Sequence, residues 1–203
     1  MRKPIVIKIF IGYLLVTLAL AGLILVFTFQ TIRNHYIDTV TNNLKTIGIA
    51  LLETTTPLVE QENMVELGAT VRGLGGRLQT RITIINAEGT VLADSQEQSD
   101  LLESHRNRPE VLSALVGNTG RSIRYSTTLG QDMIYVALPM EIRGKIKAVL
   151  RLSLPLQDIE TLLGKVKRNI LQSASIIILF SLVIALIFSH ILSSPIRLIN
   201  RAS

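Results

Sequence analysis

The sequence predicts an α+β membrane protein in which two transmembrane helices flank an extracytoplasmic domain built on one antiparallel sheet. Two apolar stretches, Ile9–Phe29 and Ala174–Leu192, enclose a mostly polar segment of about 140 residues. Each stretch has roughly the 20 residues that a helix needs to cross the hydrocarbon core of a bilayer. Within the polar segment, the spacing of apolar residues changes from three and four to two, which is typical of helices followed by strands.

These stretches set the expected boundaries along the chain. We expect a cytoplasmic N-terminus at 1–8, transmembrane helices at 9–29 and 170–192, an extracytoplasmic domain at 30–169, and a cytoplasmic segment at 193–203. The orientation follows from the short N-terminal tail, which is basic, whereas the segment after the first stretch has few basic residues. Basic residues favour the cytoplasmic side of a membrane.

The first apolar stretch also has a second interpretation. Arg2 and Lys3, the apolar run and Ala19-Leu20-Ala21 together resemble a secretory signal with a small-residue cleavage site. The apolar run continues through Leu23–Phe27, however, so cleavage there would leave an apolar new terminus. We therefore favour an uncleaved membrane anchor.

The composition argues against several classes of function. The chain has no cysteine, which excludes disulfides, thiol catalysis and cysteine-based metal sites. Its net charge is +6, but the basic residues are scattered and several flank the apolar stretches. That placement is typical of membrane interfaces, and we expect no nucleic-acid partner.

Two helices are expected before the sheet. Apolar residues recur every three or four positions over Ile32–Leu51, so the first transmembrane helix should continue outward as a long amphipathic helix. Thr54–Pro57 should end it, because β-branched residues before a proline disfavour helix. A second amphipathic helix is expected at Met64–Leu78.

Five strands and a short helix are expected next. Ile82–Ile85 and Val91–Asp94 predict a hairpin with positive φ at Gly89. A polar loop, Ser95–Ser104, leads to a short helix at Pro109–Val116, where proline and glutamate suit the first turn. The other strands are expected around Ile123–Thr127, Met133–Leu138 and Ile146–Leu154, the last with Lys147, Arg151 and Ser153 alternating with apolar residues.

The pattern returns to helix after Pro155. Apolar residues then follow the three-and-four spacing of a coiled-coil seam, at Leu156, Ile159, Leu163, Val166 and Ile170. In the second apolar stretch Ser181, Ala185 and Ser189 stand four apart, a face of small residues that permits close helix contact in lipid. We expect this helix to relay movement through the bilayer and to associate in a homodimer. The alternative is an ordinary amphipathic linker.

Catalytic chemistry finds little support in the sequence. His105 with Asp94, Asp100 and Glu103 is nearest to a metal or acid–base cluster, but these residues lack a metal-ligand spacing. A solvated loop is the favoured interpretation. We therefore expect no catalytic residue, no metal site and no cofactor in this chain.

Three resemblances point to a receptor. The segment Ser194–Ser203, with Pro195 near its start and apolar residues at Ile196 and Ile199, resembles the start of a HAMP linker, a parallel helical bundle that relays motion from transmembrane helices. Ile82–Ser95 resembles the first hairpin of Cache and PAS-like extracellular sensors. The sensor region of phosphate-regulon (PhoR-type) sensor histidine kinases is similar to three further segments: His105–Val111, Gly120–Ser126 and Met133–Pro139.

The resemblance implies a dimeric two-component receptor in the cytoplasmic membrane of a bacterium. Such a kinase phosphorylates its own histidine and passes the phosphoryl group to a response regulator. These 203 residues contain neither that phosphoacceptor motif nor an ATP-binding domain. ATP and Mg²⁺ are thus expected only for a kinase domain outside them. The sensor half of a chemoreceptor or diguanylate cyclase, or a stand-alone two-pass interaction subunit, remains an alternative.

A ligand pocket is expected on a face of the sheet. Arg108, Arg121, Arg124, Tyr125 and Tyr135 come from elements that should meet there. Arginines in such a pocket suit a carboxylate or phosphate ligand, which they hold through paired hydrogen bonds. The alternative is that the tyrosines pack in the core, the arginines are solvated, and a partner protein supplies the signal.

Overall fold

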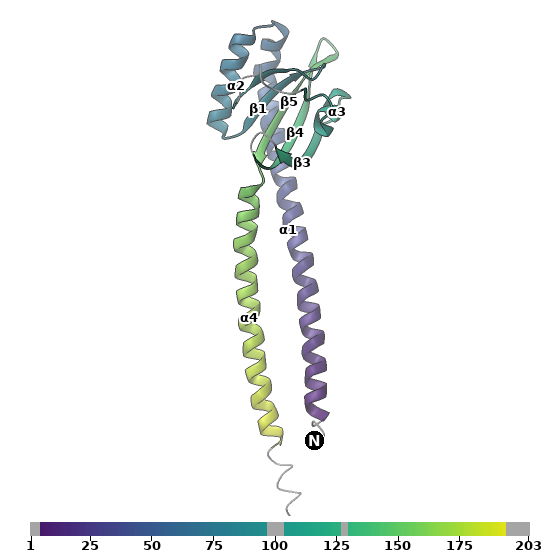
Figure 1. Ribbon diagram of the computed structural model, residues 1–203, viewed down its shortest axis with the longest axis vertical. Helices are drawn as coiled ribbons and strands as arrows, with labels where there is room; N and C mark the ends of the chain where they lie inside the picture. Colours follow the sequence, from purple (N-terminus) through teal and green to yellow (C-terminus); the bar gives the residue numbers. More distant parts are fainter. Residues whose placement is uncertain (1–4, 97–103, 127–129, 194–203) are drawn as a thin grey trace, which may run out of the picture. The chain divides into compact units, whose positions relative to one another are not determined.

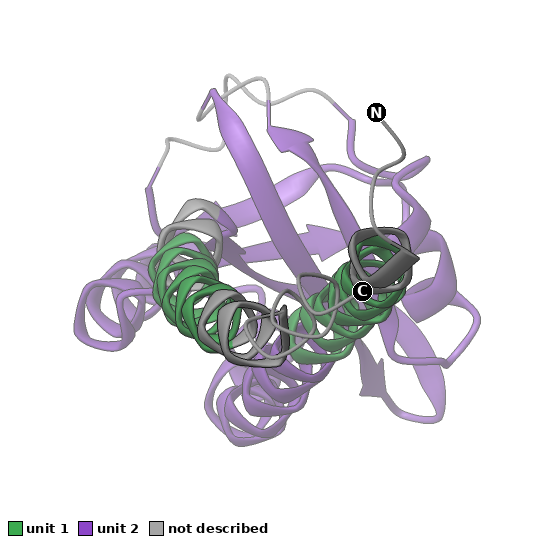
Figure 2. Ribbon diagram, turned by 90° about the horizontal axis from the view of Figure 1, so that it is seen from below, with its two compact units in different colours: residues 1–34, 161–203 green, residues 35–160 purple. Residues whose placement is uncertain are grey.

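The computed structural model describes residues 5–96, 104–126 and 130–193, and within them the side chains of 11–96, 104–126, 130–156 and 164–184. The chain forms two compact units, which Figure 2 colours separately. The first unit comprises residues 1–34 and 161–203, and the second comprises residues 35–160.

The first helix, α1, runs without interruption from Ile5 to Glu60 (Figure 1). The prediction that the first helix continues past the first apolar stretch is therefore confirmed. The predicted end at Thr54–Pro57 is wrong, because Pro57 lies inside the helix. Thr55 is buried and its hydroxyl donates to the carbonyl of Leu51 at 2.8 Å. Packing against the rest of the unit thus outweighs the low helix propensity of three threonines.

A left-handed residue ends α1 a few positions later. Glu62 has φ of +56°, and its N–H donates to Val59 while the N–H of Asn63 donates to Leu58. These two bonds are those of a Schellman motif. Asn63 then caps the second helix, α2 (Met64–Leu78), because its side chain accepts from the N–H of Glu66. The predicted second helix is confirmed.

The sheet has five antiparallel strands in the order β2-β1-β5-β4-β3, as the period-two pattern predicts. The pairing of β1 with β5 joins strands that are far apart in the sequence, so it is not a hairpin. A short helix, α3, lies between β2 and β3 in the chain. The bounds are β1 Arg81–Asn86, β2 Val91–Asp94, α3 Pro109–Leu115, β3 Gly120–Ser126, β4 Gln131–Ile142 and β5 Lys145–Pro155.

The two faces of the sheet carry different side chains. One face packs on α1, where Gly48 lies close to the side chains of Leu138 and Leu152. The other face is covered in part by α3, whose Val111 and Ala114 pack on an apolar group that includes Ile85. Beyond this apolar group the second face is polar.

Strand β5 lies in the middle of the sheet and is buried on both faces over Ala148–Ser153. Arg151 is 3% exposed and Ser153 is 2% exposed, whereas Lys147, near the beginning of the strand, is exposed. The alternating polar positions of this strand therefore do not form one solvated face. Arg151 stands between Thr83 of β1 and Ala137 of β4, inside the domain.

The last helix, α4, runs from Gln157 to Ser193. Leu156 precedes it and belongs to the core of the second unit, being 2% exposed with its N–H donating to the carbonyl of Asp132 at 2.8 Å. By length and composition, two helices could cross a membrane: the described part of α1 from Ile11 and the Gly164–Ile184 part of α4.

The residues predicted to relay a signal are only partly described. Ser181 lies on α4 with its side chain described, whereas Ala185 and Ser189 lie on α4 beyond the described side chains. Pro195 and the rest of the HAMP-like segment fall outside the described residues.

Candidate functional site

The residues predicted to bind a ligand lie on two opposite faces of the sheet. Arg108, Arg124 and Tyr135 line one small cavity on the face that α3 partly covers. Arg121 and Tyr125 do not line this cavity. Arg121 and Arg124 are three positions apart on β3, and strand side chains alternate between faces, so these two arginines point in opposite directions.

Arg121 and Tyr125 belong to the face that packs on α1. Arg121 donates to Asp38 of α1 at 2.6 Å, in an ion pair whose side chains are 46% and 60% exposed. Tyr125 is 59% exposed. The structure therefore separates these two residues from the other three.

The cavity is small and its lining is rich in arginine. Its volume is about 20 Å³. We call its lining the arginine cluster, which consists of Arg81, His105, Arg108, Arg124, Ser126, Tyr135 and Arg151. Two buried carboxylates, Asp94 and Glu110, contact members of this cluster. The cluster brings together β1, β3, β4, β5 and the segment that precedes α3.

Asp94 is held by several donors at once. The Nε atom of Arg81 lies 3.1 Å from both of its oxygens, and the hydroxyl of Thr83 donates to Oδ2 at 2.8 Å. The backbone N–H of Gln96 donates to Oδ1 at 2.9 Å. Asp94 and Thr83 are register partners on neighbouring strands. A carboxylate with several donors is the arrangement in which a buried charge is best compensated.

Glu110 makes fewer contacts than Asp94, although it is also fully buried. Its Oε1 accepts from Nη2 of Arg124 at 2.9 Å and lies 3.7 Å from Nη1 of Arg151. Its Oε2 atom has no hydrogen-bond partner. Burial lowers the pKa of Arg151 to about 10, partly offset by the attraction of Glu110, so Arg151 stays charged at neutral pH.

The ring of Tyr135 lies beneath two guanidinium groups. The Cζ atom of Arg124 is 4.0 Å from the ring centroid and that of Arg151 is 5.2 Å away. Cation–π contacts of this kind hold a guanidinium plane against a ring face. Tyr135 therefore orients both arginines that contact Glu110.

His105 is neutral in this environment. Burial, followed by the positive charges of Arg151 and Arg108, lowers its pKa from 6.5 to about 4. Nη1 of Arg151 lies 3.5 Å from Nδ1 of His105. Because a guanidinium can only donate, Nδ1 is the accepting atom and Nε2 carries the proton. That Nε2 atom is buried and has no hydrogen-bond partner.

Several members of the site were missed by the sequence analysis. Asp94 was assigned to a solvated loop, but it is buried and paired with Arg81. His105 is half-buried in the cluster, so the solvated-loop interpretation is wrong for it too. Asp100 and Glu103 lie outside the described residues. Among the described residues no group of three metal-binding side chains occurs.

For one of the missed residues, Arg151, the sequence does contain a signal that it belongs to a buried site. Arg151 interrupts a run of apolar residues from Ala148 to Leu154, and a charge in such a run indicates a buried partner. Glu110 gave no such signal, since glutamate in the first turn of a helix is ordinary.

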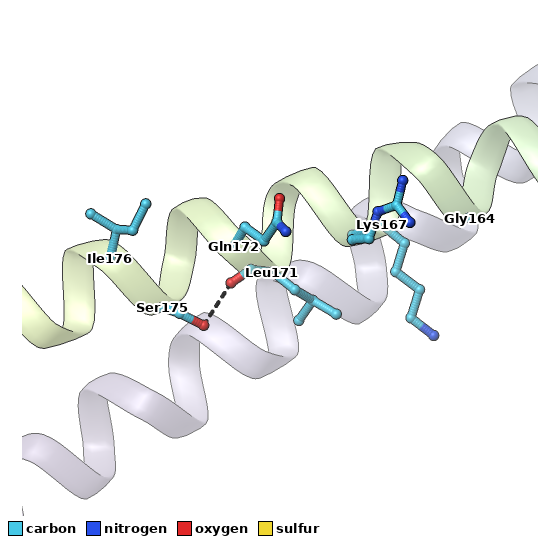
Figure 3. A pocket seen from close by; sticks show the side chains of 7 residues that line it. Gly164, Lys167, Leu171, Gln172, Ser175 and Ile176 are labelled. Carbon is cyan, nitrogen blue, oxygen red and sulfur yellow. Dashed lines mark hydrogen bonds between the residues drawn. The ribbon is translucent and has the colours of Figure 1, made fainter.

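Two larger hollows occur elsewhere among the described residues, but neither has buried polar groups without partners. One, of about 630 Å³, runs along α4 from Gly164 to Ile176 (Figure 3). All of its lining residues come from one helix, and the hydroxyl of Ser175 donates back to Leu171. The other, of about 490 Å³, lies beside the exposed pair of Arg143 and Glu60.

Comparison with known proteins gives structural matches only. No protein-family model matches the chain, and no curated protein matches it. The sensory domain of the Campylobacter jejuni chemoreceptor Tlp3 (CcmL) with isoleucine bound matches with a TM-score of 0.58 and 16% identity, over 81% of this chain and 69% of that chain. The ligand-binding domain of the same receptor in complex with L-valine gives the same values.

A histidine kinase sensor domain is also among the matches. The V. cholerae DctB sensor domain matches with a TM-score of 0.46 and 17% identity, over 54% of this chain and 45% of that chain. This chain thus spans less than half of the DctB structure. The Tlp3 matches show the fold, which has a five-stranded antiparallel sheet and a long N-terminal helix.

Proposed function

We propose that this chain is the sensing and transmembrane-relay region of a bacterial two-component sensor histidine kinase that resembles the phosphate-regulon type. The observation that carries the proposal is the connection of β5 to α4. The central strand ends at Pro155, and a helix of 37 residues begins at Gln157. A sensor fold joined in this way to a long apolar helix is the arrangement that transmembrane signalling requires.

The apolar parts of both helices support a membrane location. Tyr13, Leu23 and Phe27 on α1 are each about 70% exposed, and Ile176 and Phe180 on α4 are almost as exposed. Exposed apolar side chains in such numbers need a cover, and a lipid bilayer provides one. We place the two spans at 9–29 and 170–192 in the cytoplasmic membrane, with residues 30–169 outside the cytoplasm.

The relay would pass along α4 to the segment after it. The small residues Ser181, Ala185 and Ser189 would permit close contact between the α4 helices of two copies, which is why we propose a homodimer. Pro195 would begin a HAMP linker. The full-length protein would then phosphorylate a response regulator through a kinase domain that these residues do not include.

The proposed ligand site is the arginine cluster, with Arg108, Arg124 and Tyr135 as members already expected from the sequence. Its chemistry suits a small anion with a carboxylate group. The Tlp3 structures hold isoleucine or L-valine, and amino acids carry a carboxylate. Arg121 and Tyr125 remain a separate prediction on the other face, where a partner protein could bind.

Other outputs fit the same architecture. A chemoreceptor or a diguanylate cyclase would use the same sensor fold and differ only in the domain that follows, and a two-pass interaction subunit would have no such domain. The Tlp3 match gives the chemoreceptor alternative its specific support. The residues that follow Ser203 in the gene would distinguish these outputs.

A cysteine-accessibility experiment tests the proposed topology directly, because the chain has no cysteine of its own. We expect Asn118→Cys, at an exposed position, to react with a membrane-impermeant maleimide on intact spheroplasts. Ser203→Cys should react only after the membrane is permeabilised. Labelling of both variants, or of Ser203→Cys alone, in intact spheroplasts would overturn the proposal.

A further inference from the structure

The arginine cluster holds too little free space for a carboxylate ligand. Its cavity of about 20 Å³ has room for about one water molecule. A ligand that binds there must therefore take the place of a protein group. The protein group that the ligand displaces should make the same contacts as the ligand would, and it should be held by few hydrogen bonds.

Glu110 is such a group, as comparison with Asp94 shows. Asp94 has hydrogen-bond donors on both oxygens, supplied by the strand residues Arg81 and Thr83 and by the backbone of Gln96. Glu110 has a hydrogen bond on one oxygen only, although both of its oxygens are buried. Burying a polar atom without a hydrogen-bond partner is unfavourable. Glu110 therefore lowers the stability of the folded state through its unpaired oxygen, whereas both oxygens of Asp94 are compensated.

Most of the buried side-chain atoms without a hydrogen-bond partner in the described part of the chain are donors from the arginine cluster. Nε of Arg124, Nε of Arg151 and Nε2 of His105 are buried without hydrogen-bond partners. A carboxylate has two oxygens, each of which can accept hydrogen bonds from donors of this kind. Glu110 makes a hydrogen bond with none of these three atoms, and its own Oε2 has no partner.

The backbone of Glu110 is also placed unusually close to the sheet. Gly120 of β3 lies directly under it, and a Cβ atom at this glycine would collide with the carbonyl oxygen of Glu110. Gly120, Ala137 and Arg151 stand in one row across β3, β4 and β5. The two small residues let the first turn of α3 approach, which brings the Glu110 side chain to Arg151.

We propose that Glu110 is an internal carboxylate that occupies the ligand site, and that a small carboxylate ligand binds to Arg124 and Arg151 by displacing it. Displacement moves the first turn of α3 away from Gly120, because the side chain of Glu110 holds that turn to the cluster. The inference rests on the proposed ligand site, and it names the ligand class and the element that moves.

Acetate binding to the full chain in lipid nanodiscs tests this proposal. Acetate is the simplest carboxylate, and hydrogen exchange measured by mass spectrometry reports on α3 and on β3–β5 separately. In the wild type we expect acetate to bind weakly, to slow exchange in β4 and β5, and to speed it in residues 109–117. In Glu110→Gln, which cannot form the ion pair, we expect the apparent acetate affinity to rise at least tenfold. A tethered carboxylate competes at an effective concentration of millimolar or more.

Glu88→Gln is the matched control, because it makes the same chemical change at an exposed position of the same unit. Its acetate affinity should equal that of the wild type. Glu110→Asp, which shortens the side chain by one methylene group, should give an intermediate increase and serves if Glu110→Gln fails to fold.

Three results would count against the proposal. Unchanged or weaker acetate binding in both Glu110 variants would mean that Glu110 is a structural or ligand-supporting residue. Acetate binding without faster exchange in residues 109–117 would show that α3 does not move. An absence of acetate binding in every variant would remove the ligand site itself. The cysteine-accessibility result is independent of all three, so the topology and relay can stand if the inference fails.

Discussion

Replacing Asp94 by asparagine should destabilise the second unit strongly. The substitution keeps the shape of the side chain and removes its negative charge. The side chain at this position then no longer forms an ion pair with the guanidinium of Arg81, which is 6% exposed. The new amide also places a donor among the hydroxyl of Thr83, the N–H of Gln96 and the Arg81 side chain, all of which donate to Asp94.

The expected cost is about 3 kcal/mol. Breaking a buried ion pair from one side costs about 3–5 kcal/mol in other proteins, and the lower figure suits an amide that retains one acceptor oxygen. A domain of this size loses roughly 3–5 °C of thermal midpoint per kcal/mol. The midpoint of residues 35–160 should therefore fall by about 10–15 °C.

Thermal unfolding of the full chain in detergent micelles, followed by circular dichroism, measures this shift. Asp38→Asn is the matched control, since it breaks the exposed ion pair with Arg121. Exposed pairs contribute about 0–1 kcal/mol, so its midpoint should change by at most a few degrees. If Asp94→Asn lowered the midpoint no more than Asp38→Asn does, the argument that Asp94 anchors the cluster would be refuted.

Three further predictions concern pH, the approach of α3 and the relay. The pKa of His105 is about 4 when folded and near 6.5 when unfolded, so only the unfolded state takes up this proton between those values. Stability should fall as pH falls from 6.5 to 4, by about 1–2 kcal/mol after screening of the half-buried ring, and His105→Gln should lack this part of the pH dependence in thermal unfolding. Gly120→Ala should lower the thermal midpoint and speed hydrogen exchange in α3, because the new methyl group would collide with the Glu110 carbonyl; unchanged exchange would contradict this. Inserting two or three glycines near Gly164 should abolish signalling when the chain is fused to a histidine kinase core, and a reporter response that survived the insertion would refute relay by a stiff helix.

Much of the fold could be predicted because its signals are local. The period-two segments gave the strands, and Gly89 has the expected positive φ of +94°. The end of α1 was placed wrongly because burial of Thr55 is a tertiary effect that no local rule includes. Pro57, in the last turn, also costs the helix the hydrogen bond that a backbone N–H there would donate to the carbonyl of Glu53, and the packing of this segment outweighs that cost too.

The site could be predicted only in part, for two different reasons. The separation of Arg121 from Arg124 could have been inferred, since residues three apart on a strand face opposite sides. The position of Glu110 beside Arg151 could not have been inferred from the sequence. It depends on the pairing of β1 with β5, which puts Arg151 in the centre of the sheet, and on the missing side chain of Gly120. Both are long-range features of the fold.

The position of Arg151 gives the site a direct connection to α4. Arg151 contacts Glu110 and His105 from the middle of β5, and the same strand ends four residues later at Pro155. The N–H of Leu156 is fixed to the carbonyl of Asp132 on β4, so the end of β5 is held to its neighbour. A ligand that pulled on Arg151 would therefore act on a strand that is held at the point where α4 begins. Energetic coupling through such a connected element requires two discrete arrangements. The exchange of Glu110 for a ligand carboxylate would provide them, because the two states differ in which carboxylate Arg124 and Arg151 hold.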